Sequence, residues 1–178
     1  MSLLLTLLAA VVQVPATDGT GLIFSEPQRS GYQKWKLGLT DGYKEKKLAP
    51  SRWKVGAQSG RKVMKDLALL STLYRAAVIT KSAGYSRFFT AKMDIQNQVA
   101  ANIVVSNHVY GQEVYSTIIL HDDVASPPHC EANPKWAENC RDQSADEVIA
   151  TVGPLLGQDS AALEKEIRET RARYYGAP

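Results

Sequence analysis

The sequence predicts an α+β fold, a two-layer sandwich in which one long helix packs on a mainly antiparallel sheet and two further helices close the chain. Three observations lead to this prediction. Segments of alternating apolar and polar residues come first, a long segment with helical apolar spacing follows over residues 61–83, and more strand-like segments come after it. Ser144 and Glu147 are then spaced as a capping box that opens the first C-terminal helix, and the second helix covers about residues 160–174.

The composition predicts one folded globular domain. The chain has 178 residues, of which 44% are hydrophobic and 22% are charged. A domain of this size buries enough apolar surface to fold without a metal or a disulfide, and its charge content is ordinary for globular proteins. Disordered, fibrous and multi-span membrane classes are therefore excluded.

The first 31 residues are expected to lie outside this domain. Residues 3–12 form an uncharged apolar run, too short to cross a bilayer at about 20 residues but typical of a secretory signal, and Val14 and Ala16 follow it as small residues. We expect cleavage after Ala16, so that residues 1–16 are a signal peptide, residues 17–31 an extended arm and residues 32–178 a single domain. The alternative for the apolar run is a buried first strand or helix of a cytosolic protein.

The beginning of the domain predicts two or three antiparallel strands. Residues 32–39 alternate between apolar and polar side chains, and Asp41-Gly42 suits the tight turn of a hairpin. A second strand over residues 43–48 then reaches the turn at Pro50. Residues 52–58 follow as a further strand with its tryptophan and valine on one face.

The segment 61–83 is the longest predicted helix. Its apolar stripe is expected to face the sheet, and Gly84 is expected to end it in the left-handed conformation. Residues 85–93 are then the strand that returns under the helix. Arg75 is expected on the flank of the helix with its stem packed and its head in water, and a contact with an anion or a partner is the alternative.

Two more strands are expected in the second half of the chain. Residues 101–111 and 113–122 are rich in β-branched and aromatic side chains. Gly111 and Gln112 stand between them as a connection. No internal repeat is found.

The two cysteines support export. Cys130 and Cys140 lie in a polar segment with a proline, where a short local disulfide closes easily in an oxidising compartment. On the chain-entropy model such a loop contributes about 2.5–3 kcal/mol to stability. Two free thiols in a reducing cytosol are the alternative.

Residues 42–89, about a quarter of the chain, resemble a family of small uncharacterised proteobacterial envelope lipoproteins. The matching motifs are Gly42-Tyr43, the RWKV of residues 52–55, the LYRAA of residues 73–77 and the GYSRFF of residues 84–89. The resemblance implies an envelope location and no known chemistry. The family's signal ends in a lipid-accepting cysteine that this chain lacks, so a soluble periplasmic or secreted form is expected.

The common catalytic motifs are absent from the sequence. It has no phosphate-binding loop, no dinucleotide fingerprint, no nucleophile elbow and no zincin helix, and therefore no cofactor is predicted. One polar cluster could serve a metal-assisted enzyme, through His121, Asp122, Asp123 and His129. These residues share no known ligand spacing, and a polar strand end that runs into a loop is the preferred interpretation.

Charge is distributed unevenly along the chain. Eleven basic and two acidic residues lie between residues 29 and 65, whereas twelve acidic and four basic residues lie between residues 112 and 169. Strand alternation is expected to turn the basic side chains away from the core, and the predicted partner-binding residues are Lys34, Lys36, Lys44, Lys46, Lys47, Arg52 and Lys54.

We therefore expect an exported, non-enzymatic envelope protein that binds an anionic envelope component or an envelope protein through a basic sheet face. Nucleic acid is not an expected partner, and a cytosolic nucleic-acid binder is the alternative if residues 1–16 are not a signal. A further alternative is that the lysines are a solvated face that discourages edge pairing. The sequence leaves the oligomeric state open.

Overall fold

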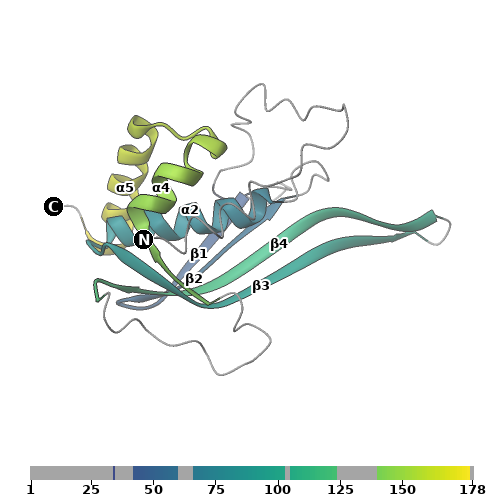
Figure 1. Ribbon diagram of the computed structural model, residues 1–178, viewed down its shortest axis with the longest axis horizontal. Coiled ribbons are helices and arrows are strands. Elements are labelled where there is room, and N and C mark those ends of the chain that lie inside the picture. Colours follow the sequence, from purple (N-terminus) through teal and green to yellow (C-terminus); the bar gives the residue numbers. More distant parts are fainter. Residues whose placement is uncertain (1–33, 35–41, 60–65, 103–104, 124–139, 177–178) are drawn as a thin grey trace.

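A computed structural model describes residues 34, 42–59, 66–102, 105–123 and 140–176 of the chain. Its five strands form one antiparallel sheet in the order β1-β2-β4-β3-β5, and helix α2 packs against one face of it (Figure 1). The α+β prediction, with a long helix on a mainly antiparallel sheet, is confirmed. The predicted signal peptide, the N-terminal arm and the strand over residues 32–39 lie outside the described residues, apart from Lys34.

Strands β1 (Gly42–Ala49) and β2 (Arg52–Ser59) form an antiparallel hairpin across the predicted turn at Pro50. Gly42, predicted in the turn of an earlier hairpin, lies at the start of β1. Gly42 pairs with Gln58 at one end, and the register shifts by a residue near Ala49 at the other. β1 is an edge strand of the sheet. β2 lies inside the sheet, between β1 and β4.

Helix α2 (Leu67–Ser82) provides most of the covering layer. Ala76 and Ala77 are almost completely buried, so the helix backbone can lie close to the sheet. The helix ends as predicted, because Gly84 adopts φ +87°, a conformation that costs glycine little and other residues more. The largest fully buried apolar side chains come from the helix and the sheet together, and they include Trp53, Val55, Tyr74, Ile79, Phe88 and Ile118.

Strands β3 (Arg87–Asn102) and β4 (Val105–His121) are much longer than predicted. The expected connection at Gly111 and Gln112 is wrong, since both residues lie inside β4. Gln112 is paired on both sides, with Asn97 of β3 and with Ser59 of β2. Neighbouring strands therefore hold this glycine-containing segment extended, whereas the sequence alone suggested a bend.

The C-terminal part contains one strand that was not predicted and two helices that were. β5 (Arg141–Ser144) pairs with β3, and α4 (Ala145–Val152) starts directly after it. The predicted cap residue is confirmed, because the Glu147 amide donates a 3.3 Å hydrogen bond to Ser144 Oγ, one of the two bonds of a capping box. A short 3-10 turn, η1 (Pro154–Leu156), leads to α5 (Ser160–Tyr175).

Helices α4 and α5 lie on the same side of the sheet as α2 (Figure 1). Both pack against α2, and α2 is the helix that contacts β1, β2, β3 and β4, so the described helices lie together on one side of the sheet. Among the described residues, no helix has the length and apolar character needed to span a membrane.

Candidate anion-binding face

Strand alternation sorts the charges of β1 and β2 between the two faces of the sheet. Trp53 and Val55 of β2 have 0% exposure and point into the core under the helices. Lys54, between them, is exposed on the opposite face, and its partner across the hairpin is Lys46, also exposed. No helix of the described part of the chain lies on this face, which we call the open face.

A row of lysines crosses the open face. Lys46 of β1 is opposite Lys54 of β2, Lys54 is opposite Thr117 of β4, and Thr117 is opposite Lys92 of β3. Residues directly opposite each other share a face, and neighbouring strands lie about 4.8 Å apart. The row, which we call the lysine row, therefore spans roughly 14 Å across four strands.

Lys92 was not among the predicted residues. The bulge between Thr90 and Lys92 shifts the alternation of β3 by one residue at this point. A simple count along the strand therefore assigns Lys92 to the wrong face. Only the observed pairing with β4 places it in the lysine row.

The neighbouring rows make one end of the open face more basic than the other. Lys44, half-buried, is opposite Gly56 in the next row, and Arg52 lies in the row on the other side, opposite Ile119. The acidic residues of this face, Asp94, Glu113 and Asp142, belong to β3, β4 and β5, and Asp142 is paired with Arg87 and His121. The basic part is therefore centred on β1 and β2.

Tyr115 packs over the backbone of this face. A Cβ atom on Gly56 would lie 2.5 Å from Tyr115 Cδ1, so the ring occupies the space that a side chain would need. Lys54 Nζ lies 5.1 Å from the centre of the same ring, within the range of a cation–π interaction. The ring of Tyr115 thus contacts the ammonium group of Lys54 and leaves its positive charge unchanged.

Lys47 departs from the predicted basic set. It follows Lys46 in the strand and therefore points to the helix side, where its Nζ lies 4.0 Å from the ring centre of Tyr175 and 5.8 Å from that of Trp53. Lys34 is exposed, and its backbone forms an isolated parallel bridge with Tyr43. Lys36 lies outside the described residues.

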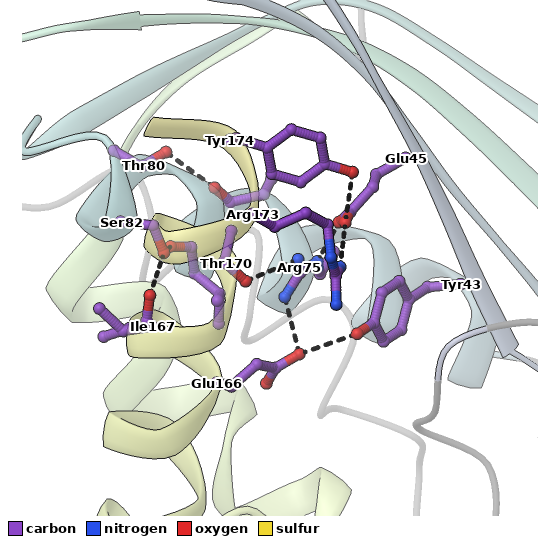
Figure 2. A network of polar contacts seen from close by, with 12 residues as sticks. Tyr43, Glu45, Arg75, Thr80, Ser82, Glu166, Ile167, Thr170, Arg173 and Tyr174 are labelled. Carbon is purple, nitrogen blue, oxygen red and sulfur yellow. Dashed lines mark hydrogen bonds and ion pairs between the residues drawn. The ribbon is translucent and has the colours of Figure 1, made fainter. Parts of the chain in front are cut away.

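The acidic residue of β1, Glu45, is turned away from the open face and binds Arg75. Both side chains have 0% exposure, so the expectation that the head of Arg75 lies in water is wrong. Arg75 Nε donates to Glu45, Nη1 lies 2.8 Å from Glu166 Oε1, and Nη2 donates to Thr170 Oγ1 at 2.8 Å (Figure 2). The arginine therefore joins β1, α2 and α5.

Further contacts complete this buried arginine network. Arg173 Nη1 lies 3.1 Å from Glu45 Oε1, and the Tyr174 hydroxyl donates to the same oxygen at 2.9 Å. The Tyr43 hydroxyl donates to Glu166 Oε1 at 3.2 Å, and the Arg75 guanidinium lies 4.7 Å from the ring centre of Tyr43. Two carboxylates thus face two guanidinium groups, as buried charges require.

The environment fixes the protonation of Glu45. Burial raises the pKa of this carboxyl, but the hydrogen bond and charge of Arg75 and the hydrogen bond from Tyr174 outweigh burial, so the pKa lies below its ordinary value. Burial raises the pKa of Tyr43 well above its usual range. The network therefore holds a carboxylate and a neutral phenol, an arrangement that suits a structural cross-link.

Within the described residues, His121 and Asp122 of the predicted metal cluster bind different partners. His121 Nε2 lies 3.0 Å from Asp142 Oδ1, and its Nδ1 lies 2.8 Å from the backbone oxygen of Asp123. The Asp122 carboxylate instead accepts hydrogen bonds of 2.7 Å from both the amide and the hydroxyl of Ser86. No group of three or more side chains that could hold a metal ion occurs in the described part of the chain.

Two predicted residues, His129 and Cys130, lie outside the described residues. Cys140 is buried, and its Sγ lies 3.5 Å from the backbone oxygen of Ala91. The described residues contain no free cysteine. The Cys130–Cys140 disulfide stays a prediction.

Comparisons with known protein families, with curated proteins and with solved structures give no match to this chain. The resemblance of residues 42–89 to envelope lipoproteins therefore stays a prediction based on its motifs. Those motifs supply buried residues of the fold, among them Trp53, Tyr74, Arg75 and Phe88. The RWKV motif also contains Lys54, which lies at the centre of the lysine row.

Proposed function

We propose that this protein is an exported, non-enzymatic envelope protein that binds an anionic envelope component or an acidic envelope protein through its open sheet face. The lysine row carries the proposal. Lys46 and Lys54 are directly opposite each other, and like charges in that position destabilise a sheet. A bound anion between the two ammonium groups would offset this repulsion, so the arrangement of the row favours anion binding.

Protection of the sheet edge does not account for the whole row. Lysines on an edge strand discourage unwanted pairing, and Lys44 and Lys46 on β1 can serve that purpose. Lys54 is paired with β1 on one side and with β4 on the other, so it protects no edge. Its exposed position in the middle of the row is better explained by a partner.

The residue types favour a partner with several negative charges. A lysine ammonium acts as a point charge, without the planar fork by which arginine recognises a single carboxylate. Several such charges in a line of roughly 14 Å suit a surface or polymer that presents repeated anionic groups. Phosphate groups of envelope lipids and polysaccharides have this character.

Retention on phosphocellulose tests the proposal with the full chain. Lys54→Glu removes the centre of the row, and Lys165→Glu is the matched control, because Lys165 is exposed on α5 and both changes lower the net charge of +3 by the same amount. We expect Lys54→Glu to elute at distinctly lower salt than Lys165→Glu. Wild-type protein is expected to elute as salt shortens the Debye length from about 10 Å at 0.1 M to about 3 Å at 1 M.

Equal elution of the two variants would mean that net charge, and no particular face, determines retention. Retention on phosphocellulose that stays unchanged as the salt concentration rises would also contradict the proposal. Lys165→Glu changes an exposed side chain and should leave the free energy of unfolding within about 0.5 kcal/mol of the wild type, whereas Lys54→Glu should not lower it, because an opposite-charge pair with Lys46 replaces a like-charge pair.

The export part of the proposal has its own test. It rests on the apolar N-terminal run, on the two cysteines and on the resemblance to envelope lipoproteins. We expect protein recovered from its native host to begin at Thr17, with Cys130 and Cys140 inaccessible to an alkylating reagent until it is reduced. A full-length chain with two reactive thiols in an intact-mass measurement would overturn export and make nucleic acid the next partner to test.

A further inference from the structure

The outer part of the β3–β4 ribbon extends beyond the rest of the sheet (Figure 1). β2 pairs with β4 only as far as Gln112, and β5 pairs with β3 only over residues 87–90. Residues 97–102 of β3 and 105–111 of β4 therefore pair with each other and with no other described strand. We call these two segments the ribbon arm.

The ribbon arm has an unusual composition for a pair of strands that extends beyond the rest of a sheet. From Ile95 to Gln112 the sequence contains no Asp, Glu, Lys, Arg or Pro, although 22% of the whole chain is charged. The edge strand β1, by contrast, carries three lysines among its eight residues. Lysine and proline are the residues that commonly protect sheet edges from pairing, so β1 is protected and the ribbon arm is not.

The two edges of the ribbon arm differ in regularity. Two register shifts occur in it, between Gln98 and Val99 and between Ala100 and Asn102. At each shift β4 holds one more residue than the facing segment of β3, so the bulges belong to β4. A bulge bends and twists the strand that contains it, which makes the β4 edge a poor template for another strand.

The outer edge of β3 is therefore the one that can accept a partner. It holds no bulge beyond Lys92, and from Ile95 onward it is uncharged. An isolated two-stranded ribbon is only marginally stable in water, and its outward N–H and C=O groups can pair with a further strand. A third strand on this edge would satisfy those groups.

We propose that two copies of the chain associate through this edge, with residues 95–102 of β3 pairing antiparallel to the same residues of the second copy. Such pairing has a two-fold axis perpendicular to the sheet, and each strand then meets its own sequence. A charged strand would meet its own charge near the axis, whereas this segment carries none. The lack of charge thus fits a second copy better than a partner selected by electrostatics.

The proposed dimer has a consequence for the open face. Because the axis is perpendicular to the sheet, the same face of both copies points in the same direction. Two lysine rows would then face one surface, and a partner with repeated anionic groups could bind both at once. The pairing itself does not depend on the open face binding an anion.

The test is the mass of the full chain in solution, measured by light scattering during gel filtration. One chain has a mass of 19.5 kDa, and we expect wild-type protein to have twice that mass. Val99→Lys places a charge on the proposed edge and should return the mass to that of one chain. Leu155→Lys is the matched control, because Leu155 is 48% exposed on η1 in the helix layer, and it should leave the dimer intact.

Three results would overturn the inference. They are a wild-type protein that stays a single chain at the highest accessible concentration, a folded Val99→Lys variant that still has the doubled mass, and a dimer that Leu155→Lys also separates. Circular dichroism and an unfolding curve establish that Val99→Lys is folded. If it is not, Gln98→Lys is measured with the same criteria. A non-reducing gel excludes a dimer held only by an interchain disulfide.

Discussion

Replacement of Arg75 by leucine should destabilise the protein strongly. Arg75 and Glu45 form an ion pair in which both side chains have 0% exposure, and Arg75 also binds Glu166 and Thr170. Removal of one partner from a buried pair costs about 3–5 kcal/mol, because the other charge remains in the protein interior. Arg173 still contacts Glu45 in the variant, so we expect a loss near 3 kcal/mol.

This loss is large compared with the total free energy of unfolding, about 5–15 kcal/mol for a native domain. For a chain of this size, each kcal/mol lowers Tm by about 2–4 °C, so Tm should fall by roughly 6–12 °C. Urea unfolding followed by circular dichroism measures the free energy, and calorimetry measures Tm. The matched control is Arg168→Leu, because Arg168 and Glu164 are 72% and 73% exposed at 3.9 Å and should contribute less than about 0.5 kcal/mol.

A cost below about 1 kcal/mol for Arg75→Leu, similar to that of Arg168→Leu, would refute the reasoning. It would mean that the charges of the network are not desolvated, or that α5 does not cover Arg75. A large loss of unfolding free energy in both variants would also refute the reasoning, because Arg168→Leu does not leave an unpaired charge in the protein interior. The contrast between the two arginines is therefore the quantity to measure.

Three further outcomes are expected. Glu45→Gln should be less stable than the wild type at pH 7, and the difference in free energy of unfolding should narrow as pH falls below about 4.3. Burial raises the pKa of Glu45 but Arg75 lowers it further, so the stabilisation from the carboxylate is lost when the carboxylate becomes protonated. A difference that stays constant in urea titrations from pH 7 to pH 3 would contradict this. Gly56→Ala should cost about 1–3 kcal/mol, because the new Cβ would meet the ring of Tyr115 and a backbone oxygen, and a thermal scan that matches the wild type would argue against that contact. Ser144→Ala should cost about 1 kcal/mol through the lost helix cap, whereas Ser144→Thr should retain most of it in the same unfolding assay.

The sequence predicts most of the fold because most of its elements carry local patterns. Each of these patterns joins residues only a few positions apart in the sequence. They are the alternation in β1 and β2, the helical spacing of α2 and the cap spacing of Ser144 and Glu147 at α4. β5 escaped prediction because its four residues, RDQS, are polar and its pairing partner lies more than fifty residues earlier in the chain. A strand that short is defined by its neighbour, and the sequence does not show which neighbour it will have.

The same limit explains the error at Arg75. A single arginine in an apolar helix most often lies on a solvated flank, and one stripe of apolar residues suggested a helix covered on one side only. In the structure α5 covers a second side of α2, and the partners of Arg75 on α5 are 91 and 95 residues away. Local spacing contains no information about a contact at that separation.

The buried arginine network and the open face both follow from the alternation of β1. A strand of this kind has one side chain in two on each face, so the residue between Lys44 and Lys46 must point toward the helices. That residue is Glu45, an acid that cannot be buried without a partner, and Arg75 provides one. If Glu45 faced the lysines instead, the open face would lose much of its positive potential. The buried arginine therefore does more than join α2 and α5 to the sheet, because it also keeps the acidic residue of β1 away from the lysine row.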